Sequence, residues 1–229
     1  MYNHTMNYKL SLIPTGILHV NTWFFFKDNS LYLIDPGGDP DKIISHIEKE
    51  WENYLKKSHL EQKNIFILLT HCHFDHISAI PELLDYFPKA RLFAHEKDAE
   101  VLGKGSRERV IMQARWCGIE NYKDFLQKDI PFPELLTGES KIGPFKVIHT
   151  PGHTPGSCCY YWEAGNILFS GDTLFYGSYG RTDFPGGNGI EMAASLKKLS
   201  ILPKKTLVLP GHGEYTTIEA EETTFNTLS

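Results

Sequence analysis

The heptapeptide THCHFDH, residues Thr70–His76, contains three histidines and one aspartate and directly follows the apolar run NIFILL. An apolar run of this length, bounded by polar residues, predicts a buried strand. Ligand-type side chains gathered where a strand ends contribute little to packing, and loops held at strand ends by a rigid sheet are where binding and catalytic sites are commonly built. The heptapeptide therefore indicates a metal site.

Alternation along an extended segment divides these side chains between two faces. His71 and His73 share one face, and Cys72 points to the other, so we interpret Cys72 as a core residue rather than a ligand. Asp75 and His76 begin the next predicted helix and point elsewhere. The two pairs of ligands can therefore hold two different metal ions.

Three further ligand-type residues follow other predicted strands: His153 in TPGHTPGS, Asp172 in SGDT and His212 in LPGHG. Imidazoles and carboxylates suit zinc, iron or manganese. An open tetrahedral site needs only three protein ligands, so this set is too large for one metal. It fits two metals, each with three ligands of its own, and one carboxylate that bridges them. Asp172 is the candidate for the bridging carboxylate.

The motifs THCHFDH, TPGHTPGS, GDTLF and LPGHG, with LIDPG upstream, resemble those of the metallo-β-lactamase superfamily, from about Leu31 to Gly213. The resemblance implies an α/β fold, the αβ/βα sandwich of two mixed β-sheets flanked by helices. It also implies two divalent metal ions between the sheets, with zinc expected and iron or manganese as alternatives. The first metal would be held by His71, His73 and His153, the second by Asp75, His76 and His212, with Asp172 bridging and Asp35 supporting the loops.

Within the superfamily, the motifs look most like the glyoxalase II-like (hydroxyacylglutathione hydrolase-like) branch, in a short single-domain form. The stretch after GDTLF reads YGSYGRTDFPGGN, without the Lys- and Tyr-bearing glutathione motif of that branch, and only sixteen residues follow Gly213. The implied activity is hydrolysis of thioesters. The nucleophile would be a hydroxide shared by two metals about 3.5–4 Å apart, and Asp75 would orient it and later carry a proton.

Two other activities stay open. GRTDF resembles a motif of the persulfide dioxygenases of the same superfamily, whose single iron would here be held by His71, His153 and Asp172. Phe74 stands where those enzymes favour a small residue, which favours the hydrolase. A lactonase would use similar ligands.

Arg181, Tyr176 and Tyr179 follow Asp172 and are candidates for substrate binding, since a guanidinium can pair with a substrate carboxylate. The alternative is that Arg181 fixes the loop of Asp183. A predicted helical insertion at residues 103–128 carries six Lys or Arg and three acids, a charge of +3. This segment is either an ordinary solvated helical face or a basic segment beside the site. In the second case it favours a small anionic thioester as substrate.

The whole chain has 229 residues, 41% of them hydrophobic, and a net charge of −5. We expect one domain over residues 1–229. The acidic balance argues against nucleic acid as a partner, and no apolar run approaches the ~20 residues of a membrane helix. The start of the chain lacks the basic and apolar regions of a secretion signal, so we expect a cytoplasmic protein. The sequence carries no signal for an oligomeric state.

Periodicity predicts strands at residues 8–14, 16–26, 29–38, 64–70, 90–95, 143–152, 157–164, 166–172 and 205–213. Helices are predicted at 39–57, 76–87 and 190–202. The run WFFF, Trp23–Phe26, predicts a strand buried on both faces.

Overall fold

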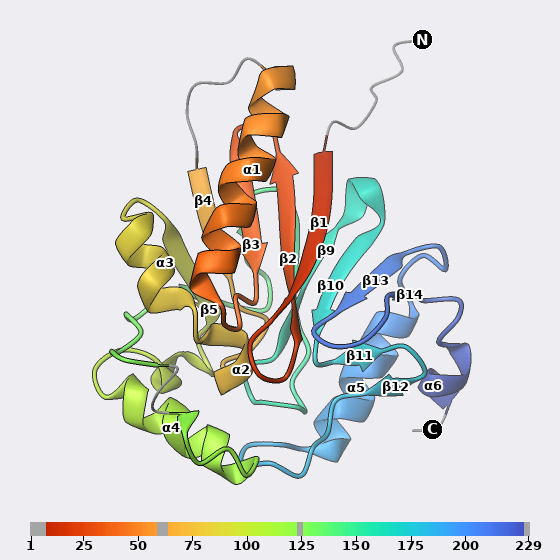
Figure 1. Ribbon diagram of the computed structural model, residues 1–229. Helices are drawn as coiled ribbons and strands as arrows, with labels where there is room; N and C mark the ends of the chain where they lie inside the picture. Colours follow the sequence, from red (N-terminus) through yellow and green to blue (C-terminus); the bar gives the residue numbers. More distant parts are fainter. Residues whose placement is uncertain (1–7, 59–63, 123–125, 227–229) are drawn as a thin grey trace.

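The computed structural model describes residues 8–58, 64–122 and 126–226. Two six-stranded sheets face each other, and helices cover their outer sides (Figure 1). Four segments lie outside the described residues: 1–7, 59–63, 123–125 and 227–229. The first belongs to the stretch in which we expect no secretion signal, and the third belongs to the predicted insertion.

The first sheet has the strand order β1-β2-β3-β4-β5-β6. Its first three strands are antiparallel, and the pairs from β3 onward are parallel. Parallel neighbours need a crossover connection, which helix α1 (Pro40–Ser58) supplies between β3 and β4. The strands are β1 (Tyr8–Thr15), β2 (Val20–Lys27), β3 (Ser30–Ile34), β4 (Asn64–Leu68), β5 (Arg91–His95) and β6 (Glu134–Leu136).

The second sheet has the order β14-β13-β10-β9-β8-β7. Among its described strand pairs, only β10 and β13 are parallel, and helix α5 (Gly189–Ser200) connects them. Asn188 caps α5, because its side-chain oxygen accepts hydrogen bonds from the amides of Ile190 and Glu191. The strands are β7 (Lys141–Ile142), β8 (Phe145–His149), β9 (Cys158–Trp162), β10 (Ile167–Gly171), β13 (Leu207–Pro210) and β14 (Thr216–Thr217).

Shorter elements connect the two sheets and cover their ends. The small hairpin of β11 and β12 follows β10, and α4 lies in the predicted insertion. These elements are α2 (Phe74–Ile77), α3 (Ile80–Tyr86), η1 (Ala99–Val101), α4 (Ser106–Trp116), η3 (Glu163–Gly165), β11 (Leu174–Phe175), β12 (Ser178–Tyr179) and α6 (Glu222–Asn226).

Strand β2 shows how the layers form. Phe24 and Phe26 pack with Trp51 of α1 on the outer side of the first sheet. Trp23 and Phe25 point the other way and join aromatic residues of the second sheet. This alternation buries both faces of the strand, as predicted for WFFF. On the far side of the second sheet, α5 completes a third cluster. The layers are therefore helix, sheet, sheet, helix, which confirms the predicted fold class.

The predicted strands and helices are present, with ends shifted by a few residues. The second predicted strand begins at Val20 rather than residue 16, because residues 16–19 form the turn to β1. The sequence did not indicate the two- and three-residue strands β6, β7, β11, β12 and β14. None of the described helices is both long and apolar enough to cross a membrane.

Candidate metal centre

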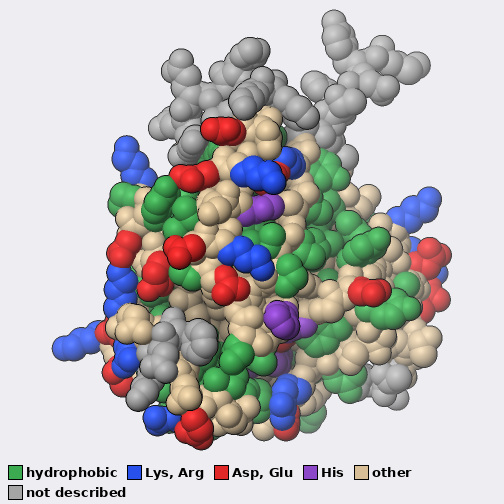
Figure 2. All heavy atoms as spheres, viewed as in Figure 1, with side chains coloured by type: hydrophobic (Ala, Val, Ile, Leu, Met, Phe, Trp, Pro, Cys, Tyr) green, Lys and Arg blue, Asp and Glu red, His purple; other side chains and the backbone are tan. Residues whose placement is uncertain are grey.

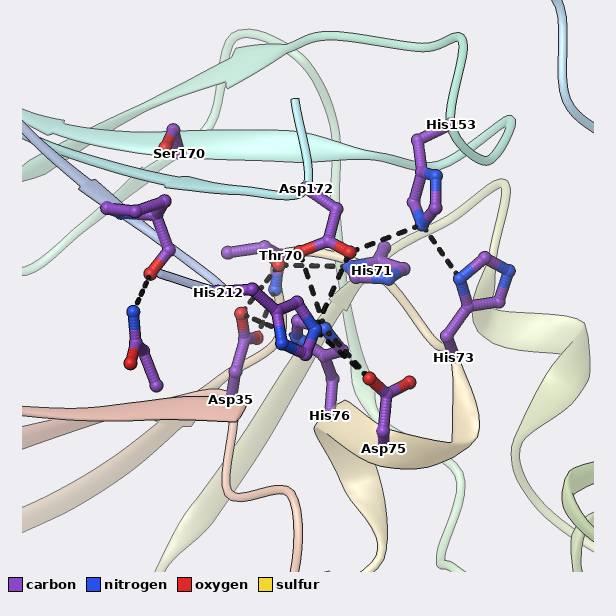
Figure 3. Close-up of polar contacts among 12 residues, drawn as sticks. Asp35, Thr70, His71, His73, Asp75, His76, His153, Ser170, Asp172 and His212 are labelled. Atoms are coloured by element: carbon purple, nitrogen blue, oxygen red, sulfur yellow. Dashed lines mark hydrogen bonds and ion pairs between the residues drawn. The ribbon is translucent and has the colours of Figure 1, made fainter. Parts of the chain in front are cut away.

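The seven predicted ligands lie together at one end of the sandwich, although four separate segments carry them (Figure 3). His71 and His73 follow β4 in the first sheet, and Asp75 and His76 lie in the first turn of α2. The other three come after β8, β10 and β13 of the second sheet, and are His153, Asp172 and His212. Each sheet thus contributes part of the cluster.

The ligand-type atoms form three overlapping groups in which all atoms lie within 4.8 Å of one another. They are His71, His73 and His153; His71, His76 and Asp172; and Asp75, His76 and His212. The first and third have the composition expected for the two metals. Asp172 lies between them, with Oδ2 3.6 Å from Nε2 of His153 and Oδ1 3.5 Å from Nε2 of His76.

Several of these atoms are buried without a hydrogen bond. They include Nε2 of His71, Nε2 of His76 and Oδ1 of Asp172. A buried polar atom left unpaired costs about 1–3 kcal/mol, more when it is charged. A divalent metal would satisfy all three at once, since imidazole nitrogens and carboxylate oxygens are its ordinary ligands. The residues present therefore fit a metal pair.

Neighbouring groups orient the imidazoles. Asp35 accepts hydrogen bonds from the backbone amide and the hydroxyl of Thr70, at 2.8 and 2.7 Å, and its Oδ2 lies 3.1 Å from Nδ1 of His76. Nδ1 of His153 donates to the carbonyl of Arg181 at 2.7 Å, which leaves Nε2 facing the cluster. Such partners fix the tautomer and the ring direction of metal-binding histidines. Asp35 lies where the supporting residue of the loops was expected.

Burial and charge act in opposite directions on the site. Burial lowers the pKa of His73 to about 3, so this imidazole is neutral. Burial would also lower the pKa of His76, but the carboxylates of Asp172, Asp75 and Asp35 outweigh it and raise the pKa to about 10. Burial would raise the pKa of Asp75, but the imidazoles of His76 and His212 outweigh it and hold that pKa below its usual range. Three carboxylates close together favour a cation, and a metal supplies more positive charge than one proton.

Glycines allow the ligand loops to approach each other. A Cβ on Gly211 would lie 2.3 Å from Oδ1 of Asp172 and 2.7 Å from Cε1 of His76. A Cβ on Gly180 would lie 1.8 Å from the carbonyl oxygen of Asp172. No side chain fits at either position unless the ligands move.

Sequence reasoning missed Asp98. Its carboxylate is buried and accepts hydrogen bonds from the amide of Cys72 at 3.1 Å, the hydroxyl of Thr154 at 2.7 Å and the amide of Gly156 at 2.6 Å. Cys72 lies between two ligands, and the other two residues follow His153 within three positions. Asp98 therefore connects two ligand loops. It also follows a predicted strand, residues 90–95, which is the signal that identified the other aspartates.

A cavity of about 340 Å³ opens beside the ligands. In Figure 2, histidine side chains reach the surface in the lower centre of the view, next to hydrophobic side chains. The wall consists of ligands and mostly apolar residues. It is formed by Leu18, His73, Phe74, Asp75, Gln113, Trp116, Cys117, His153, Asp172, Phe175, Gly180, Arg181, Phe184 and His212.

Of the three predicted substrate-binding residues, one lines the cavity and two do not. Arg181 lines the cavity, but its Nε and a terminal nitrogen each donate to Asp183 at 2.7 Å. This pairing is the alternative stated above, in which Arg181 fixes the loop of Asp183. Tyr176 is 64% exposed and Tyr179 packs against the cluster around α5, so the structure places neither in the cavity wall.

The insertion at residues 103–128, predicted from its charge to favour an anionic substrate, reaches the cavity without its arginines. Helix α4 does reach the cavity, through Gln113 and Trp116. Its arginines, however, bind backbone carbonyls and acids: Arg107 donates to Leu126, Arg109 to Val101, Leu102 and Lys104, and Arg115 lies 3.9 Å from Glu120. A count of charges could not show that these guanidinium groups make contacts within and beside the insertion and do not line the cavity.

A helix–sheet–sheet–helix sandwich with clustered histidines and aspartates at the ends of its strands defines a class of metalloenzyme. The chain belongs to the metallo-β-lactamase superfamily, whose family model matches residues 15–212. Members of this superfamily are in general hydrolytic enzymes that bind divalent metals.

Three similar proteins illustrate the family. A protein described as a probable metallo-hydrolase, YqgX of Bacillus subtilis, is 35% identical over 220 residues, covering 92% of each chain. The hydroxyacylglutathione hydrolase GloC of Haemophilus influenzae is 32% identical and covers 93% of this chain and 94% of its own. The crystal structure of TTHA1623 in a di-iron-bound form is 33% identical, with a TM-score of 0.74, and covers 92% of this chain and 96% of its own.

Proposed function

We propose that this chain is a cytoplasmic hydrolase of thioesters that uses two divalent metal ions, with zinc as the expected metal. The observation that carries the proposal is the position of the ligand groups. The two expected metal sets share one cluster through Asp172, and that cluster forms part of the wall of an open cavity. A substrate in this cavity would meet the ligands directly.

When bound, two divalent metals make hydroxide available from water near neutral pH and polarise a carbonyl group. Asp75 lies in the cavity wall, with Oδ2 3.1 Å from Nε2 of His212. Its carboxylate can orient water and hold the proton that the leaving thiolate needs. The apolar wall lowers the local polarity and so strengthens electrostatic interactions within the site.

The cavity also contains a thiol, Cys117, which could suggest a cysteine nucleophile. Burial and the charge of Asp75 raise the pKa of Cys117, although Arg181 opposes them. A thiol with a raised pKa is a poor nucleophile at neutral pH. The metal-dependent route is therefore favoured. The similarity to GloC, a hydroxyacylglutathione hydrolase, supports thioesters as the substrates.

The test is to express the chain, measure its native metal content and assay the metal-loaded protein against thioesters, a lactone and glutathione persulfide. We expect thioester hydrolysis without oxygen uptake, and two metals per chain. Asp172→Asn and His71→Ala should reduce kcat/KM by at least about 100-fold. The control Asp85→Asn changes an exposed residue paired with Lys128 and should have no effect.

Two outcomes would replace the proposal. One iron per chain with oxygen consumed on the persulfide would establish the dioxygenase. A lactone turned over far better than any thioester would establish the lactonase.

A further inference from the structure

The cavity wall offers little charge to a substrate beyond the metal ligands. Leu18, Trp116, Phe175 and Phe184 contribute apolar surface, and Arg181 is the one Lys or Arg among the described residues that line this cavity. The charge of +3 on the insertion at residues 103–128 is therefore not carried into this wall.

The charge of Arg181 is already compensated. Its guanidinium forms a two-point contact with Asp183, at 2.7 Å for both oxygens, and lies over the ring of Phe184 at 3.8 Å from the centroid. Arginine and a carboxylate held in this fork geometry satisfy each other. A substrate carboxylate would have to displace Asp183 to reach the guanidinium.

Gln113 is a neutral polar side chain of the wall and projects from α4. Its Oε1 is buried, so that atom does not face the cavity. Apart from the metal site, the described wall therefore has no uncompensated cation that would bind a substrate carboxylate.

We propose that the cavity selects uncharged thioesters, with an apolar chain against Trp116 and Phe184. Thioesters of N-acylated cysteamine have this chemistry, since they combine an apolar acyl group with a thiol portion that carries no charge. The inference rests on the proposed function, of which it specifies the substrate class.

The kinetic test compares S-butanoyl-N-acetylcysteamine with S-lactoylglutathione on the metal-loaded chain. We expect kcat/KM to favour the uncharged substrate by at least about tenfold. Trp116→Ala should lower kcat/KM for it by about tenfold or more, mainly through KM. Asp183→Asn should release Arg181 and shift the ratio of kcat/KM values toward the anionic substrate. Arg115→Ala, a cationic residue of α4 that does not line the cavity, is the matched control.

Binding provides a readout that does not depend on hydrolysis. Trp116 is 47% exposed, whereas Trp23, Trp51 and Trp162 are buried, so a change in tryptophan fluorescence reports on the cavity. S-butyl-N-acetylcysteamine, a thioether that cannot be hydrolysed, should quench this fluorescence at lower concentration than S-butylglutathione. Trp116→Phe should remove the signal.

The outcomes separate the two proposals. If glutathione thioester and thioether are preferred in both tests, the inference is wrong and the thioester hydrolase stands. If no thioester is hydrolysed but the uncharged thioether binds preferentially, the selectivity stands and the proposed reaction fails. Equal binding of the two thioethers would overturn the inference whatever the kinetics.

Discussion

Asp98 and Thr154 lie 56 residues apart in the sequence, yet the hydroxyl of Thr154 donates a hydrogen bond of 2.7 Å to the buried carboxylate of Asp98. The same oxygen accepts from the amide of Cys72, and the other from Gly156. The loop that carries His71 and His73 is thereby joined to the loop that carries His153. All three residues of the first predicted metal set lie on the two loops that this carboxylate joins.

Asp98→Asn should therefore weaken the first metal site. In the wild-type chain both oxygens of Asp98 accept hydrogen bonds. In the variant an NH2 group replaces one of these oxygens and cannot accept, so at least one hydrogen bond is lost at a cost of about 1–3 kcal/mol in unfolding free energy. Loss of a group that orients metal ligands typically lowers metal affinity about 10- to 100-fold. Metal content after titration with a chelator should fall toward one ion per chain.

The matched control for Asp98→Asn is Asp183→Asn, which changes an exposed carboxylate outside the ligand loops. It should leave metal content unchanged. Equal metal retention by Asp98→Asn and the wild-type chain would show that the two loops hold their positions without this connection.

Gly211→Ala should disrupt the ligands directly. The added methyl group would lie 2.3 Å from Oδ1 of Asp172 and 2.7 Å from a ring carbon of His76, so both side chains would have to move. A misplacement of about 1 Å can reduce activity about 100-fold, and metal binding should weaken as well. In Gly189→Ala the added methyl group would approach only the hydroxyl of Thr182, at 3.7 Å, and this variant should keep its metals. Normal metal content in Gly211→Ala would contradict the close approach of the two ligand loops.

Cys72→Ala tests whether this cysteine is a core residue or a ligand. Its side chain is buried in the cluster of the first sheet, away from the metal groups. The substitution should leave metal content and kcat unchanged and lower the unfolding free energy by about 0.5–3 kcal/mol, as core truncations do. A loss of metal without a loss of stability would instead assign Cys72 to the metal.

Without metal, the chain should be most stable near pH 6.5. Burial lowers the pKa of His73 to about 3, so the unfolded chain binds a proton that the folded chain does not, and stability falls as the pH drops from about 6.5. Burial opposes the three neighbouring carboxylates at His76, but they raise its pKa to about 10. The stability from that protonated imidazole is complete below about 6.5 and is lost as the pH rises toward 10.

Urea unfolding of the chelator-treated chain across this pH range measures both effects. In the metal-loaded chain the loss at alkaline pH should be absent, because a histidine bound to metal is neutral. His76→Gln should reduce the alkaline loss in the metal-free chain. Stability that increased steadily from neutral to alkaline pH would contradict the charge assigned to His76.

The sequence could predict the ligand cluster because the signal is local. Four ligand-type residues in six positions, and single ones placed after apolar strands, need no knowledge of distant contacts. Asp98 carried the same signal in weaker form, since it stands three residues after a predicted strand and outside any motif. The tertiary contact with Thr154 is what gives it a role.

Arg181 and the arginines of α4 show what the sequence could not provide. Composition gave the charge of the insertion correctly, but the direction of each guanidinium depends on which carbonyls and acids the fold brings within reach. Arg109 binds three backbone carbonyls of its own region, and Arg181 binds Asp183. Arg109 does not line the cavity, and Arg181, which does, is paired with Asp183, so the net charge of the insertion is not by itself an argument for an anionic substrate.

Phe25 lies where the two sheets meet, with its ring centroid 5.1 Å from Phe145, 5.0 Å from Trp162 and 6.1 Å from Phe169. Since each sheet contributes ligands, the thickness of this aromatic layer sets how far apart the two halves of the coordination sphere stand. The hydrophobic core thus helps to set the separation of the metal ligands. We expect Phe25→Leu to change the relative affinities of the centre for ions of different radius, and competition between zinc and manganese for the metal-free chain measures this.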